Sequence, residues 1–118
     1  VARAESYIKN GQFKRAKSFL KKQLRKKPKN QRLNLLLGGV YSIEQKHKQA
    51  VKYFRRSGKS VKKSRYGFYY GISFYAVKKC QQAVYGFKQV RKKNPEIFAD
   101  SQFYIGVCYY NQRRFTLA

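Results

Sequence analysis

The sequence has few of the residues that catalytic and metal sites use. Only 4 of its 118 residues are Asp or Glu and one is His, against 29 Lys or Arg, which gives a formal net charge of +25. No two of the acids are placed as a general acid–base pair: they are Glu5, Glu44, Glu96 and Asp100. The lone His47 stands at an expected corner between two helices, and no glycine-rich phosphate loop is present. We therefore expect no enzymatic activity, no catalytic residue, no metal, no cofactor and no small-molecule substrate.

Cysteine is scarce as well. Cys80 and Cys108 stand 28 residues apart and lack the C-x-x-C spacing of zinc sites. We expect two free thiols, which suits a reducing compartment and so favours the cytoplasm.

Long apolar runs are also missing. No run reaches the length of a transmembrane helix, and the first residues, VARAESYIKNGQF, contain no apolar signal region. The chain begins without Met and stops at FTLA, which is typical of a piece of a longer protein or of a processed chain.

Aromatic residues, by contrast, are plentiful. The chain contains 11 Tyr and 9 Phe, and 42% of its residues are hydrophobic. A disordered chain of this charge would be poor in aromatics, so the composition indicates a folded core. Only two prolines, Pro28 and Pro95, interrupt the sequence, which suits long helices.

Small and aromatic residues recur with a period near 34. Alanines recur at spacings of 34, 33 and 35, at Ala16, Ala50, Ala83 and Ala118. Twelve residues before each alanine lies a small residue: Ala4, Gly38, Gly71 and Gly106. Three residues after each of these comes an aromatic: Tyr7, Tyr41, Phe74 and Tyr109. Four residues after the first three alanines stand Leu20, Phe54 and Phe87. A repeat of this length indicates an array of similar structural units.

Each unit reads as two helices. Apolar residues surround most of the first helix of a unit, whereas the second is amphipathic with a 3.6-residue period. Asn10 and Gly11 interrupt the first pair, and Pro28 and Pro95 follow second helices. The pattern predicts helices at 1–10, 13–27, 31–44, 47–58, 64–77, 80–93 and 97–111, with another starting at 114.

These columns resemble the tetratricopeptide repeat family. The resemblance covers the whole chain and implies an all-α fold, a right-handed α-superhelical solenoid of antiparallel helix pairs. It implies one array over residues 1–118, with repeats at about 1–30, 31–63, 64–98 and a truncated one at 99–118. The small and aromatic columns are then buried where helices meet, in four pairs that include the truncated one. Some family members grip a C-terminal carboxylate, but Val1 and Glu5 occupy the corresponding first-repeat positions, so we expect no such clamp here.

The resemblance also implies a binding groove lined by the first helices of the repeats. The groove positions are Arg32, Leu35, Gly39 and Ser42, then Arg65, Phe68, Ile72 and Tyr75, then Asp100, Phe103, Val107 and Tyr110. This stripe is apolar and aromatic, which favours a non-enzymatic scaffold that binds a partner helix, a peptide or a second copy. The predicted contact residues are Leu35, Phe68, Ile72, Tyr75, Phe103, Val107 and Tyr110. In the alternative interpretation, the stripe packs against a neighbouring repeat or flanking sequence.

The positive charge has three possible interpretations: a solvated surface, a binding site for a polyanion, or deliberate supercharging of a designed variant. Bases crowd the second helices, where like charges at i, i+4 spacing oppose folding. A polyanion-binding module for RNA, DNA or an anionic surface is therefore the alternative function, and non-specific binding is expected at low salt. Its first candidate residues are Lys21, Arg25, Lys52, Arg55 and Arg91.

Overall fold

A computed structural model describes residues 1–117 of the chain, with side chains described up to residue 113. Within this range the chain is all-α, which confirms the predicted fold class. The seven α-helices of the described residues are α1 (Ala2–Lys9), α2 (Phe13–Lys26), α3 (Gln31–Ile43), α4 (His47–Phe54), α5 (Gly67–Ala76), α6 (Cys80–Phe87) and α7 (Pro95–Leu117). A short 3-10 helix, η1 (Gly58–Val61), follows α4.

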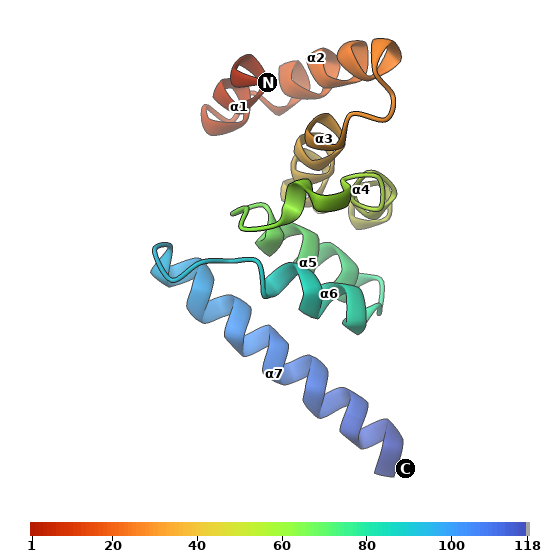
Figure 1. The fold of residues 1–118 in the computed structure, drawn as a ribbon, viewed down its shortest axis with the longest axis vertical. Coiled ribbons are helices and arrows are strands. Elements are labelled where there is room, and N and C mark those ends of the chain that lie inside the picture. Colours follow the sequence, from red (N-terminus) through yellow and green to blue (C-terminus); the bar gives the residue numbers. More distant parts are fainter. Residues whose placement is uncertain (118) are drawn as a thin grey trace. The chain divides into compact units, whose positions relative to one another are not determined.

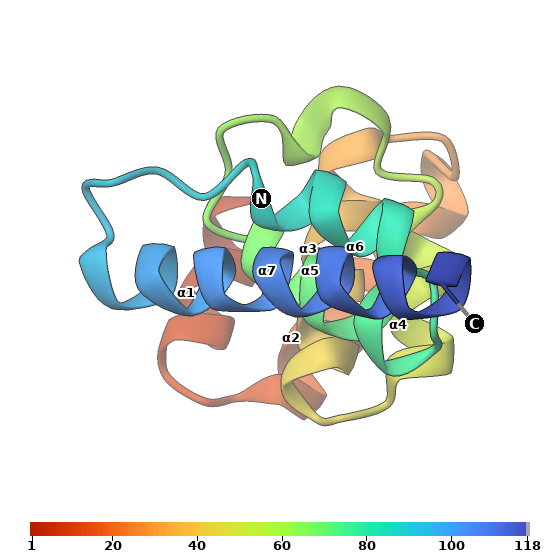
Figure 2. The ribbon, with the colours of Figure 1, turned by 90° about the horizontal axis from the view of Figure 1, so that it is seen from below.

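The helices fall into two compact units, which we describe separately. The first, Val1–Ser60, contains the sequential pairs α1/α2 and α3/α4 (Figure 1). The second, from Val61 onward, contains the pair α5/α6, with α7 packed against both of its helices (Figure 2). The order of helices in each unit is that of a tetratricopeptide-like helical repeat.

The same turn joins the two helices of each pair. Gly11, Gln45 and Lys78, spaced by 34 and 33 residues, adopt a left-handed backbone with φ of 75°, 63° and 64°. In each turn the next backbone N–H donates a 2.8 Å hydrogen bond to the carbonyl of the aromatic column residue, Tyr7, Tyr41 or Phe74. This Schellman-type cap satisfies the carbonyls at the helix end. It reverses the chain so that the second helix packs back antiparallel on the first.

Two of the small residues create the contact between paired helices. A Cβ added at Gly38 would lie 2.7 Å from the Phe54 ring, and one added at Gly71 would lie 2.6 Å from the Phe87 ring. The missing side chain thus lets an aromatic ring lie directly on the backbone of the first helix. The alanines Ala16, Ala50 and Ala83 are fully buried, as predicted.

Two second helices are shorter than predicted. The helix expected to reach residue 58 ends at Phe54, where the Ser57 hydroxyl donates to the Phe54 carbonyl at 2.6 Å and Gly58 takes a left-handed φ of 52°. The helix expected to reach residue 93 ends at Phe87, and Val90 turns into the core beyond it. The burial of Val61 and Val90 therefore stabilises the chain more than a further turn of helix after Phe54 or Phe87 would.

The expected break at residues 111–114 is absent, and this prediction was wrong. Instead α7 is one 23-residue helix that runs to Leu117, and Arg113, the counterpart of Gly11, lies within it. A left-handed non-glycine residue costs about 1–2 kcal/mol. The described residues contain no helix that follows α7 and packs back on it to offset that cost, and a continuous helix keeps its backbone hydrogen bonds.

The prediction of two free thiols was also wrong. Cys80, the first residue of α6, forms a disulfide with Cys108 of α7, with 5.5 Å between the Cα atoms. The spacing of the two cysteines did not predict the disulfide, because its formation depends on which side of α7 faces α6. The disulfide does not support a reducing compartment.

Candidate functional site

One face of α7 is committed to the core of the second unit. The residues of this inner face recur at i, i+3, i+4 and i+7 and are Ser101, Tyr104, Ile105 and Cys108. Tyr104 stacks on Phe87 of α6, with 5.3 Å between centroids and 8° between planes, and also lies edge-on to Tyr75 at 5.2 Å. These contacts and the disulfide fix which side of α7 points outward.

The opposite side of α7 carries exposed aromatic residues. Phe103 is 68% exposed, Tyr110 63% and Tyr109 49%. Gly106 lies among them, and a Cβ added there would meet no heavy atom within 4 Å. We call this set, with Gln102, the outer face of α7: Gln102, Phe103, Gly106, Tyr109 and Tyr110. Residues 101–112 contain no charged side chain, although Lys88 Nζ lies over the Tyr109 ring, 5.9 Å from its centre. Figure 1 shows no other helix of the second unit along this flank of α7.

The exposure of Gly106 contradicts the prediction that the whole glycine column is buried. Its counterparts Gly38 and Gly71 are each covered by a phenylalanine ring of the following helix. The next column behaves in the same way, because Tyr41 and Phe74 are buried while Tyr109 is half exposed. Gly106 and Tyr109 are therefore exposed at positions whose counterparts earlier in the chain are buried.

The predicted groove residues divide into three groups. Leu35 is fully buried in the core of the first unit, so it has no surface to offer a partner. Four residues are half-buried: Phe68, Ile72, Tyr75 and Val107. Of these, Phe68 lies edge-on to Phe87, with 6.0 Å between the ring centroids. Phe103 and Tyr110 alone among the seven are exposed. The structure thus brings the accessible candidates together on α7.

Sequence reasoning missed Gly106 and Tyr109 as surface residues. Both belong to columns that are buried in earlier repeats, so the pattern assigned them to the core. The residue types at these positions gave no signal of the difference, because Gly106 matches Gly38 and Gly71, and Tyr109 matches Tyr41.

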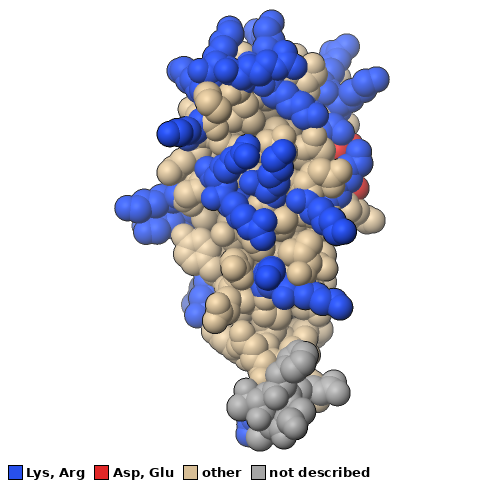
Figure 3. Space-filling view, turned by 90° about the vertical axis from the view of Figure 1, so that its right-hand side faces the viewer, with Lys and Arg blue, Asp and Glu red and all other residues tan. Residues whose placement is uncertain are grey.

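The first unit has a different surface, dominated by positive charge. Residues 1–60 contain 18 Lys or Arg and two acids. Both acids form ion pairs, Glu5 with Arg32 at 2.6 Å and Glu44 with Lys17 at 2.8 Å. Figure 3 shows Lys and Arg side chains crowded on one face of the molecule, with little acidic surface between them. The net charge of residues 1–60 is therefore strongly positive.

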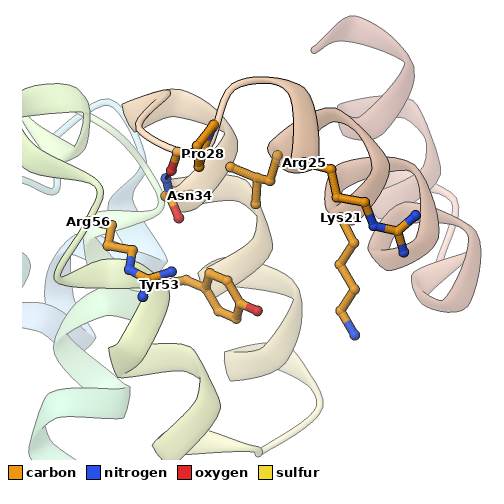
Figure 4. A pocket seen from close by; sticks show the side chains of 7 residues that line it. Lys21, Arg25, Pro28, Asn34, Tyr53 and Arg56 are labelled. Carbon is orange, nitrogen blue, oxygen red and sulfur yellow. Dashed lines mark hydrogen bonds between the residues drawn. The ribbon is translucent and has the colours of Figure 1, made fainter.

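An open pocket of about 300 Å³ lies among these bases (Figure 4). It is lined by residues of α2, α3, α4 and the segments that follow α2 and α4: Lys21, Leu24, Arg25, Pro28, Asn34, Tyr53 and Arg56. Buried Asn34 donates through its Nδ2 to the carbonyls of Asn30 (2.9 Å) and Pro28 (3.2 Å). Its Oδ1 accepts no hydrogen bond from the described residues. The pocket therefore combines three cations with a buried amide whose oxygen has no hydrogen-bond partner among the described residues.

The predicted polyanion residues are only partly brought together. Lys21 and Arg25 line the pocket, and a hydrogen bond with Tyr41 raises the pKa of Lys21 above its ordinary value. Lys52 Nζ lies 5.6 Å from the centre of the Tyr53 ring, and exposed Arg55 directly follows α4. Arg91 belongs to the second unit. Arg56 and Tyr53, which sequence reasoning did not single out, complete the pocket.

Other kinds of site find little support in the described part of the chain. It contains no cluster of three or more His, Cys, Asp or Glu side chains that could hold a metal ion. Among the described residues, no helix is long and apolar enough to cross a membrane.

The pairing of α1 with α2, the Schellman-type turn between them and the buried Ala4 and Ala16 make residues 1–30 a complete helical repeat. Residues 1–30 match the tetratricopeptide repeat family. No curated protein and no solved structure matches the chain. Tetratricopeptide repeats suggest interaction with other proteins, and the family is typically non-catalytic.

Proposed function

We propose that this chain is a non-enzymatic protein-interaction scaffold that binds a partner segment through the exposed aromatic residues of α7. The observation that carries the proposal is the exposure of Phe103 and Tyr110 on a stretch without charge. Aromatic rings supply large contact areas and dominate the binding energy of many interfaces. Exposed apolar surface of this kind is typical of a binding site.

The surrounding charge strengthens this choice of site. The chain carries +25, yet residues 101–112 have none of it. A partner that covers Phe103 and Tyr110 therefore covers a stretch with no charge of its own, and burial of an unpaired charge would cost free energy. Lys88, whose Nζ lies 5.9 Å from the centre of the Tyr109 ring, borders this stretch.

The test uses a displayed library of amphipathic helical and extended peptides selected on the wild-type chain. Peptides that bind should lose most of their affinity for a Phe103→Ser/Tyr110→Ser double variant, because both rings are exposed and their loss leaves the core intact. Tyr85→Ser is the matched control, since Tyr85 is 40% exposed on α6. Equal binding to wild type and to the double variant would refute the proposal. Phe68 is unsuitable for this test because it packs against Phe87.

A second candidate is polyanion binding by the first unit, supported by the cations around the pocket of Lys21, Arg25 and Arg56. A phosphate group could be held there by charge-assisted hydrogen bonds. We rank it second because these bases are exposed and because any chain of +25 attracts nucleic acid at low salt. A sub-micromolar affinity for one RNA at physiological salt would reverse the ranking.

A further inference from the structure

The pocket of the first unit differs from the rest of the basic surface because several segments of the chain build it. Lys21 and Arg25 lie one turn apart on α2, whereas Arg56 follows α4. The seven described residues that line the pocket include no acid. Like charges at i, i+4 destabilise a helix, and a third cation nearby adds to the repulsion. An anion held among the three side chains offsets this cost, so the pocket favours an anionic ligand.

Packing fixes one wall of the pocket. The Tyr53 ring stacks on the Tyr41 ring, with 5.6 Å between centroids and 7° between planes. Lys21 donates a hydrogen bond to Tyr41, and its Nζ lies 5.6 Å from the centre of the same ring. The aromatic pair thus holds a wall and a cation in place, which lowers the entropic cost of binding. A volume of about 300 Å³ lies at the small end of ligand sites, so it suits a small molecule.

Asn34 offers a second kind of contact. It is fully buried, and Figure 4 shows its side chain between Pro28 and the side chains of Tyr53 and Arg56. Because its Nδ2 donates to the carbonyls of Asn30 and Pro28, a flipped amide would place oxygen against oxygen. Its Oδ1 therefore stays an acceptor, and it has no donor among the described residues. A buried acceptor without a donor costs free energy, so a ligand that brings a donor is favoured.

From these features we infer that the pocket binds a small phosphate ester that also carries hydroxyl groups, the chemistry of sugar phosphates and inositol phosphates. The three cations hold the phosphate groups through charge-assisted hydrogen bonds. A ligand hydroxyl donates to Asn34 Oδ1. Arg25 and Arg56 are exposed, so their long side chains can move onto the phosphate and admit the hydroxyl. The compound is bound and not converted, and its site is independent of the one proposed on α7.

The first test compares two ligands of equal charge. Fructose bisphosphate carries hydroxyl groups between its two phosphates, whereas the bisphosphate of hexanediol carries none. Calorimetry with the full 118-residue chain at physiological salt should show one site for the sugar ligand. Its affinity should exceed that of the alkyl ligand by about threefold or more, the size expected for one hydrogen bond.

Two triple variants separate the pocket from the general charge. The first removes the three cations that line the pocket: Lys21→Gln/Arg25→Gln/Arg56→Gln. The second is its charge-matched control and removes three exposed lysines of α2 and α4 that do not line it: Lys22→Gln/Lys26→Gln/Lys48→Gln. The first should weaken the sugar ligand by about tenfold or more, because direct phosphate contacts are lost. The control should weaken it by less than about threefold, because salt screens charges outside the pocket.

Asn34→Leu tests the hydroxyl contact. This variant should bind the two bisphosphates with equal affinity, because the acceptor is gone. It also loses the two hydrogen bonds of Nδ2, so circular dichroism is needed to show that it is folded. If it is not folded, the two ligands and the two triple variants still decide the question.

A vesicle experiment identifies the source of the phosphate ester. Vesicles of phosphatidylcholine carry either phosphatidylinositol bisphosphate or phosphatidylserine at equal total charge. Stronger sedimentation with the inositol lipid, lost in the first triple variant, would assign the site to a lipid head group. Binding of the soluble sugar ligand alone would assign it to a free compound.

Three outcomes would overturn the inference. One is the absence of both sugar-ligand binding and a preference for the inositol lipid. Another is equal weakening by the two triple variants, because charge alone would then explain the binding. The third is equal affinity of the wild-type chain for the two bisphosphates, which would leave Asn34 without a role.

Discussion

The ring of Phe87 stacks on the ring of Tyr104, with 5.3 Å between their centroids and 8° between their planes. The Phe87 ring also lies against the backbone at Gly71 and has Phe68 edge-on to it at 6.0 Å. One side chain of α6 thus serves both the first helix of its own repeat and the first helix of the next. Because Tyr104 lies on the inner side of α7, the aromatic residues on the outer side, Phe103 and Tyr110, are exposed.

The glycine column gives a matched set of stability predictions. Gly38→Ala and Gly71→Ala should each lower the free energy of unfolding by about 1–3 kcal/mol, because the new methyl group overlaps a phenylalanine ring. Gly106→Ala should raise it by roughly 0.5–1 kcal/mol, because alanine is the better helix former and the site is open. Urea denaturation of the three variants measures both effects. Destabilisation by Gly106→Ala would mean that its surroundings are not open.

The turns between paired helices allow a second comparison. Gln45 and Lys78 have a left-handed backbone that glycine adopts without steric cost. Gln45→Gly and Lys78→Gly should therefore each stabilise the fold by up to about 1 kcal/mol, while Gly11→Ala should destabilise it by about 1–2 kcal/mol. Melting temperatures of the single variants provide the test. A loss of stability in both glycine variants would argue against these turns.

Reduction of the disulfide should destabilise the second unit. A cross-link over 28 residues between Cys80 and Cys108 lowers the entropy of the unfolded chain, and the expected loss on reduction is about 3–4 kcal/mol on the chain-entropy estimate. Urea denaturation with and without reductant measures this loss, and a Cys80→Ser/Cys108→Ser variant is the control. Two thiols that react with a thiol reagent in the native, unreduced protein would show that the disulfide does not form.

Nucleic-acid binding should follow charge alone. We expect the logarithm of affinity to fall with the logarithm of salt concentration, with a slope of about −0.7 to −0.9 per phosphate neutralised, and without preference for a sequence or for RNA over DNA. Replacing Lys21, Arg25 and Arg56 by Gln should reduce the slope, whereas Phe103→Ser should not change it. Filter binding at several salt concentrations gives these slopes. Retained specific binding at physiological salt would favour the second candidate function.

The repeat period predicted the fold because its cause is local. A missing Cβ at Gly38 or Gly71 admits the ring sixteen residues later, and both members of each contact stand in the repeat columns. The early end of α4 at Phe54 was less visible, since it depends on the Ser57 hydroxyl and the left-handed Gly58.

The candidate site was only partly predictable, because residues at equivalent positions of the repeat differ in how exposed they are. Leu35 and Phe103 occupy the same repeat position, yet Leu35 is buried and Phe103 is 68% exposed. Gly106 carries the same residue type as Gly38 and differs only in having no ring above it. The Cys80–Cys108 disulfide likewise depends on the rotation of α7 about its axis, which no sequence spacing reveals.

The most direct test of the central claim is hydroxyl-radical footprinting of the chain with and without a bound partner peptide selected on it. In the free chain Phe103 and Tyr110 should be oxidised readily and the buried Phe54, Phe74 and Phe87 slowly. Binding should protect Phe103 and Tyr110 while leaving Tyr85 unchanged, because the partner covers the outer face of α7. Unchanged oxidation of both residues in the saturated complex would contradict the account and direct attention to another surface.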